Sequence, residues 1–265
     1  MDIVAMTVCT VDLFSKTGKS FLGGNSLNFA VQAKSSSPES RVSLIGAVGR
    51  DVHGARIREF LEKRNILTDR LYALEGKTAT NELFNDETGE RFGVPGAWNG
   101  GVYEDFKLSE GDWEFALGCD VIATHGNNPN FTELLRRKNG KALLSVDFLD
   151  VLNDVPMEGR LAGIGIALVT APQERSPAYK ALSDKYGVLI VQTMGADGSL
   201  AFYRGKTFRQ TAIPVSKVID TTGCGDSYLA AFTVQYMKTR DIPASMNEGA
   251  TAASAVLAYL GGVGE

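Results

Sequence analysis

The amino-acid sequence predicts an α/β protein built on a mostly parallel β-sheet that helices cover on both faces. Its 265 residues, 44% hydrophobic and 22% charged, suit one large α/β domain. Several short apolar segments lack the polar alternation of a half-buried strand, which is typical of strands buried on both faces. Helical segments separate these strands, and that alternation favours a parallel sheet.

The bulk composition limits the partners of this protein. A formal net charge of −4 argues against nucleic acid or an anionic membrane surface as a partner. No apolar run approaches the ~20 residues of a membrane span, and the N-terminus lacks the basic start of a signal peptide. Cys9, Cys119 and Cys224 lie far apart and predict neither a disulfide framework nor a zinc site. We therefore expect a cytoplasmic protein with reduced cysteines and without a nucleic-acid or membrane partner.

The first predicted element is a buried strand over residues 2–12 that ends at Asp12. The segment 15–20 that follows ends in Gly-Lys-Ser. Leu13 occupies the position of the first P-loop glycine, so the match fails and we expect an ordinary turn.

A helix is predicted to begin at Gly23-Gly24-Asn25-Ser26-Leu27-Asn28. The paired glycines allow the backbone to approach a ligand closely. Asn25 and Asn28 are three residues apart and share one face of the first turn. Two interpretations stay open: Asn25 is an N-cap and Asn28 a solvated residue, or this face contacts a ligand.

The middle of the chain departs from the α/β alternation. After a strand over 41–49 and an amphipathic helix over 55–65, the sequence changes character between 71 and 106. A strand over 78–84, a turn at 86–89 and a return strand over 90–92 predict a β-hairpin. The glycine-rich loop after it carries Trp98, which either covers a substrate or packs in the core.

Regular alternation resumes further along the chain. We expect strands over 119–125, 142–147, 164–170 and 188–193, an extended segment over 213–219, and helices over 131–138, 178–186, 227–234 and 247–256. Ligands of parallel sheets bind at the carboxyl ends of the strands. The polar residues and the glycine that follow predicted strands are Asp12, His125, Asp147, Glu174 and Gly195.

The string Asp220-Thr221-Thr222-Gly223-Cys224-Gly225-Asp226 is the strongest functional signal. Two glycines one residue apart at a helix start leave backbone N–H groups unpaired, and the helix dipole favours an anion there. A carboxylate beside such a site suits a base that deprotonates a hydroxyl during phosphoryl transfer. The alternative is that Asp226 is a helix N-cap. Chance produces the five fixed positions of D-T-x-G-x-G-D about once per million start sites.

This string closely resembles the second signature of the ribokinase-like (phosphofructokinase B) sugar kinases, and Gly-Gly-Asn-x-x-Asn at 23–28 resembles their first signature. The resemblance implies one kinase domain over residues 1–265, folded as a three-layer sandwich. It also implies a small β lid from segments near 13–22 and 71–106.

The resemblance further implies the roles of individual residues. Asp226 would be the base, and the anion hole would be formed by the N–H groups of Gly223, Cys224 and Gly225. The sugar would be held by Asp12, Gly23, Gly24 and Asn28. ATP would be bound by Thr193, Gly195, Gly198, Thr222, Asn247 and Ala250, and Mg²⁺ by Glu174. A monovalent cation and a homodimer formed through the lid are left open.

Two departures from the family pattern bear on the substrate. Thr7-Val8 stands where these kinases carry Gly-Asp or Gly-Glu, and Ala171-Pro172-Gln173-Glu174 stands where they carry Asn-x-x-Glu. The latter string resembles the branch that phosphorylates fructoselysine. We therefore expect an ATP-dependent kinase acting on a primary hydroxyl of a sugar or a sugar-amine (Amadori) substrate. The alternatives are a nucleoside or other small-sugar kinase, and a non-catalytic sensor of sugars or nucleotides, which would not explain the intact catalytic string.

Overall fold

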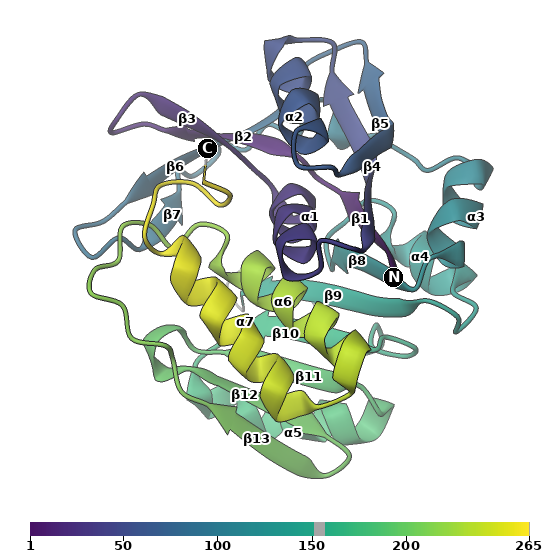
Figure 1. The fold of residues 1–265 in the computed structure, drawn as a ribbon, viewed down its shortest axis with the longest axis vertical. Helices are drawn as coiled ribbons and strands as arrows, with labels where there is room; N and C mark the ends of the chain where they lie inside the picture. The colour runs from purple at the N-terminus through teal and green to yellow at the C-terminus, as the bar shows by residue number, and fades with distance from the viewer. Residues whose placement is uncertain (151–156, 265) are drawn as a thin grey trace.

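The computed structural model describes residues 1–150 and 157–264 and contains a nine-stranded main sheet. Its strands are β1 (Asp2–Thr7), β4 (Arg41–Gly49), β5 (Leu67–Leu74), β8 (Val121–His125), β9 (Leu143–Asp150), β10 (Ile166–Thr170), β11 (Leu189–Thr193), β12 (Ser199–Tyr203) and β13 (Lys206–Gln210). They lie in the order β13-β12-β11-β10-β9-β8-β1-β4-β5 (Figure 1). Within this sheet, the pairs β11–β12 and β12–β13 are antiparallel and the other pairs are parallel, which confirms the predicted mostly parallel α/β fold.

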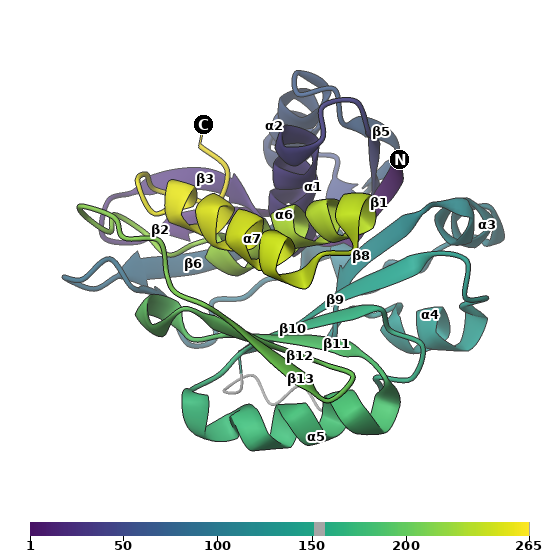
Figure 2. The same ribbon diagram turned by 60° about the horizontal axis from the view of Figure 1, so that its bottom comes forward.

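Helices cover both faces of the main sheet (Figure 2). One layer contains α1 (Asn25–Ser36), α2 (Val52–Glu62), α6 (Cys224–Thr239) and α7 (Ile242–Val256), and the other contains α3 (Glu110–Gly118), α4 (Phe131–Arg137) and α5 (Ser176–Tyr186). Strand β1 shows why two layers form: Ile3 and Ala5 pack into one apolar core, and Val4 and Met6 into the other. Among the described residues, no helix combines the length and the apolar character needed to span a bilayer.

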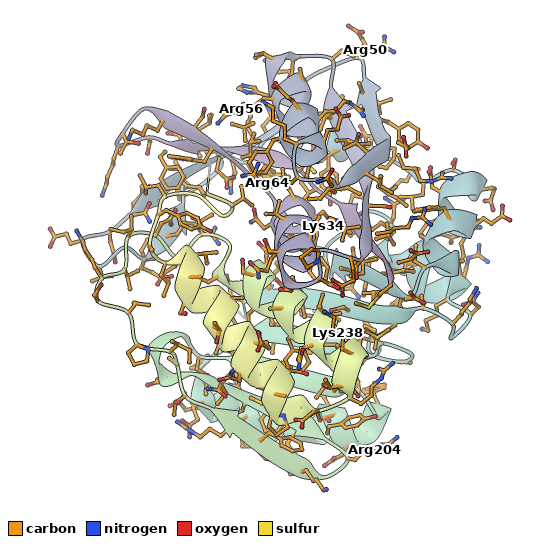
Figure 3. All side chains as sticks on the ribbon, viewed as in Figure 1. Lys34, Arg50, Arg56, Arg64, Arg204 and Lys238 are labelled. Carbon is orange, nitrogen blue, oxygen red and sulfur yellow. The ribbon has the colours of Figure 1, made fainter. Side chains whose placement is uncertain are left out.

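A second, smaller sheet contains β2 (Thr10–Phe14), β3 (Lys19–Gly23), β6 (Ala79–Asn85) and β7 (Arg91–Gly93), in the order β3-β2-β6-β7. It extends from the carboxyl end of β1, because only two residues separate β1 from β2 (Figure 1). Arg56 also fixes it to α2, since its guanidinium donates to Ser20 Oγ on β3 at 3.0 Å (Figure 3).

The single strand predicted over 2–12 is therefore wrong, because the chain breaks at Val8-Cys9 and the two halves join different sheets. Both halves are buried, so the apolar run is continuous across the break and contains no turn residue that would mark it. The predicted hairpin is confirmed as β6 and β7.

Strands β5 and β13 and helix α3 were not predicted. Strands β5 and β13 are edge strands of the main sheet. They are partly exposed and rich in polar residues, so they lack the apolar run that indicates a buried strand. Helix α3 begins at a capping box in which the Ser109 side chain accepts from Asp112 N–H and Asp112 accepts from Ser109 N–H. The segment 213–219 contains no strand.

Candidate active site

A cavity of about 440 Å³ lies where the small sheet meets the carboxyl ends of the main-sheet strands. Residues from both signatures line it, although about 200 residues separate them in the sequence. The predicted site residues that line this cavity are Asp12, Gly24, Asn28, Thr222, Gly223 and Asp226.

Asp226 is the third residue of α6, and two side-chain amides hold its carboxylate. Asn25 Nδ2 donates to Oδ1 at 2.9 Å and Asn28 Nδ2 donates to Oδ2 at 2.8 Å. Burial raises the pKa of Asp226, and the two amides act in the opposite direction. The N-cap of α6 is Gly223 and that of α1 is Gly24, so neither Asp226 nor Asn25 is the helix cap that the alternative interpretations required.

Thr222 and Gly223, in the turn before α6, line the cavity. Gly223 has φ 78°, and a Cβ there would lie 2.7 Å from Gly262 Cα, so only glycine fits. The Cys224 N–H donates to Thr221 O at 3.3 Å. Among the described residues, the N–H groups of Gly223 and Gly225 have no hydrogen-bond acceptor, which leaves them available to an anion. Burial raises the pKa of the Cys224 thiol to about 12, so this cysteine is no nucleophile near neutral pH.

Asp12 reaches the cavity from β2. It is buried, and its Oδ1 accepts from Thr10 Oγ1 at 3.0 Å. Burial raises the pKa of Asp12 to about 6. A Cβ at Gly23 would lie 2.2 Å from Asp12 Oδ2, so Gly23 makes room for this carboxylate and does not itself line the cavity.

The hairpin of the small sheet is bonded to the loop that precedes α6. Thr221 N–H donates to Gly89 O at 3.2 Å, Arg91 N–H donates to Thr221 Oγ1 at 3.0 Å, and Asn85 Nδ2 donates to Asp220 Oδ1 at 2.8 Å. We call these three hydrogen bonds the latch. The buried Asp220 also accepts from Thr222 N–H at 3.0 Å and from Gly261 N–H at 2.8 Å, so the latch ends on a rigid anchor.

Sequence reasoning missed Arg91, whose side chain lines the cavity from β7. Its position depends on the hairpin pairing with Asn85, and no local motif marks it. Trp98 also lines the cavity and is 44% exposed, which excludes the alternative that it packs in the core. Asn25 carried a signal in its spacing from Asn28, but the sequence did not indicate that both would bind Asp226.

Apart from Thr222, the residues assigned to the nucleotide and the metal do not line the cavity. Thr193 ends β11, Gly195 and Gly198 flank the next turn with φ 58° and 86°, and Asn247 (exposed) and Ala250 (buried) lie on α7. Glu174 is exposed in a 3-10 helix, Gln173–Arg175, just after β10.

In the described part of the chain, Glu174 does not belong to a cluster of metal-ligating side chains. Over residues 1–150 and 157–264, no group of three or more His, Cys, Asp or Glu side chains could hold a metal ion. Asp147 is buried within the neighbouring strand β9, and its pKa is raised to about 7, mainly by burial and then by the charge of Asp226. The Thr7 side chain lies outside the described part of the chain.

Comparison with known proteins supports the signatures. The model of the pfkB family of carbohydrate kinases matches residues 4–116 and 160–264. Curated relatives include the fructoselysine 6-kinases of Shigella flexneri and Escherichia coli, each 28% identical over 95% of both chains. The fructosamine kinase of Bacillus subtilis is 25% identical over 100% of this chain and 93% of its own.

Solved structures show the same fold. The ribokinase of Arabidopsis thaliana, in complex with ribose and ATP, has a TM-score of 0.81 at 21% identity and covers 98% of this chain and 94% of its own. The nucleoside kinase of Methanocaldococcus jannaschii has a TM-score of 0.79 at 21% identity, covering 99% of this chain and 93% of its own.

Proposed function

Because the chain belongs to the pfkB family of carbohydrate kinases, and is thus a phosphotransferase with an alcohol acceptor, we propose that it phosphorylates a sugar-amine. The γ-phosphoryl group of ATP is transferred to a primary hydroxyl of an Amadori compound such as fructoselysine. The observation that carries the proposal is the Asp226 carboxylate, held by two amides beside the unpaired N–H groups at the start of α6.

In this mechanism, Asp226 accepts the proton of the substrate hydroxyl as its oxygen attacks the γ-phosphorus and ADP leaves. The N–H groups of Gly223 and Gly225 and the dipole of α6 stabilise the charge of the phosphoryl group in transit. Asp12 and the cavity-facing backbone at Gly24 orient the sugar. The small sheet acts as a lid that excludes water.

The nucleotide side of the site is assigned to Thr193, Gly195, Gly198, Thr222, Asn247 and Ala250. Mg²⁺ is commonly bound through one or two carboxylates together with waters and phosphates, so the exposed Glu174 at the sheet's carboxyl edge fits this role. The ion, when bound, neutralises phosphate charge.

Two lines of support favour a sugar-amine over a plain sugar or a nucleoside. The string Ala171–Glu174 departs from the common family pattern and resembles the fructoselysine branch. Two relatives that span 95% of this chain are also named as fructoselysine 6-kinases.

The test is ADP release from Mg-ATP with fructoselysine, fructose, ribose and adenosine as acceptors. We expect the highest kcat/KM with fructoselysine, and a loss of roughly 10²–10⁴-fold in kcat for Asp226→Asn. ATP binding should hold in that variant, because Asn keeps the side-chain shape and removes a charge that repels phosphate. A folded Asp226→Asn protein with normal turnover would contradict the mechanism, and a higher kcat/KM for a plain sugar or a nucleoside would contradict the substrate.

A further inference from the structure

The cavity has two chemically different ends. Strand β6 lines the cavity between them. Asn85 pairs with Arg91 near one end of β6, and Thr80 pairs with Asn99 near the other. Five residues of strand span about 17 Å at ~3.3 Å per residue, which is longer than one sugar ring. One end thus faces the loop before α6, and the other faces the loop that carries Trp98.

The distal end pairs an aromatic ring with a carboxylate. Trp98 Nε1 donates to Glu104 Oε1 at 3.3 Å, and the indole meets Tyr103 edge to face with ring centroids 6.5 Å apart. A Cβ at Gly100 would lie 2.4 Å from Glu104 Cγ, so the glycine permits this conformation of Glu104. Both Trp98 and Glu104 line the cavity and are exposed to it.

Within the part of the chain that the structure describes, no cation compensates the charge of Glu104 at this end of the cavity. Among the described residues, Glu104 forms no ion pair, and the one hydrogen-bond partner of its side chain is the Trp98 indole. Burial lowers the pKa of His125 to about 4, so this cavity residue is neutral at pH 7. Lys107 donates to Pro129 O at 3.2 Å and does not line the cavity.

The whole cavity, like the end that contains Glu104, carries more negative than positive charge. Its carboxylates are Asp12, Glu104 and Asp226, and its one guanidinium, among the described residues, belongs to Arg91 at the opposite end. A carboxylate beside an exposed indole favours a cationic group, which gains both a charged hydrogen bond and a contact with the ring face.

We infer that Glu104 and Trp98 form a subsite for an ammonium group carried by the acceptor sugar at the end remote from its phosphorylated hydroxyl. This inference rests on the proposed kinase function and adds to it the residues that select the substrate. Asp12 pairs with Asn81 on β6, next to Thr80, and therefore holds the sugar between the ammonium subsite and Asp226.

The experiment compares Glu104→Gln with wild type on two acceptors, a fructosamine with a secondary amine at C1 and its N-acetylated, neutral analogue. We expect KM for the amine to rise roughly tenfold in Glu104→Gln, the usual effect of losing a charged hydrogen bond, with kcat unchanged. KM for the neutral analogue should stay constant. The matched control is Asp105→Asn, an exposed neighbour outside the cavity, which should change neither KM.

Equal changes in KM for both acceptors, or no change for the amine, would overturn the subsite. Trp98→Leu should weaken amine binding more than Trp98→Phe does, because Phe retains a ring face.

Calorimetric binding of the amine without ATP separates the two proposals. Glu104-dependent binding without phosphorylation of any acceptor would refute the kinase function and support the subsite. Phosphorylation with a lower KM for the neutral analogue than for the amine would support the kinase function and refute the subsite.

Discussion

The pair of amides on Asp226 links two segments that are about 200 residues apart in the sequence. Each amide donates to the ionised form of the carboxylate and so opposes the effect of burial on its pKa. A buried base without such donors would hold its proton and could not accept one from the substrate. Asn25 is therefore a positioning residue that favours the ionised form of Asp226.

This role predicts the behaviour of Asn25→Ala. The pKa of Asp226 should rise by roughly one unit, because one donor to the charged form is lost. The acid limb of the kcat/KM profile should move to higher pH by the same amount, so activity at pH 6 falls more than activity at pH 8. Gln32→Ala, further along α1 and bonded to Ser36, is the control and should leave the limb in place. A uniform loss across pH in Asn25→Ala would mean that Asn25 only supports the fold.

At the level of the element, the first turn of α6 contains two glycines with different constraints. Gly223 needs both its positive φ and its close contact with Gly262. A Cβ at Gly225 would meet only Asp147 Oδ2, at 4.0 Å. The fold therefore tolerates a side chain at Gly225, and the proposed anion site predicts that glycine is needed here to leave space above its N–H group.

Gly225→Val tests that reason. The side chain would stand where the phosphoryl group approaches, so kcat should fall by roughly 100-fold, the effect of losing one donor of an oxyanion hole. The melting temperature should stay within about 5 °C of wild type, because no buried contact is broken. Gly223→Val serves as the contrast and should lower the melting temperature clearly. Full turnover in a folded Gly225→Val protein would exclude the anion site.

At the level of the whole molecule, a buried carboxylate makes stability depend on pH. The folded-state pKa of Asp147, about 7, lies above its ordinary value of 3.8, so the folded protein binds this proton more tightly than the unfolded chain. The contribution of Asp147 to the free energy of unfolding is therefore full below about pH 4 and is lost as pH rises towards 7.

Asp147→Asn should remove this dependence, since Asn cannot ionise and retains an oxygen that can accept from Leu149 N–H. Relative to wild type, the variant should gain on the order of 2–4 kcal/mol between pH 4 and pH 8 in urea unfolding. Glu87→Gln, at the exposed hairpin tip, should show no such gain. Parallel stability curves for Asp147→Asn and wild type would contradict the raised pKa.

The sequence could predict those parts of the molecule that depend on local pattern. Buried parallel strands appear as apolar runs, the first of which ends at Asp12. The two glycine-rich signatures mark their own turns, which is why Asp226 and Asn28 could be named in advance. The break at Val8-Cys9 could not be predicted, because burial in either sheet requires the same apolar residues. Arg91 and Glu104 could not be predicted either, since hairpin pairing and loop packing bring them to the cavity.

The latch also makes the opening of the small sheet measurable by hydrogen exchange. The amide protons of Thr221 and Arg91 are both engaged in it, so they exchange with solvent only when the hairpin lifts from the loop before α6. Lids of this kind move in microseconds to milliseconds, which is far faster than the exchange of protons in a packed core. The exchange rates of these two protons therefore report how often the small sheet opens. A molecule enclosed beneath the sheet would slow their exchange without contacting either amide.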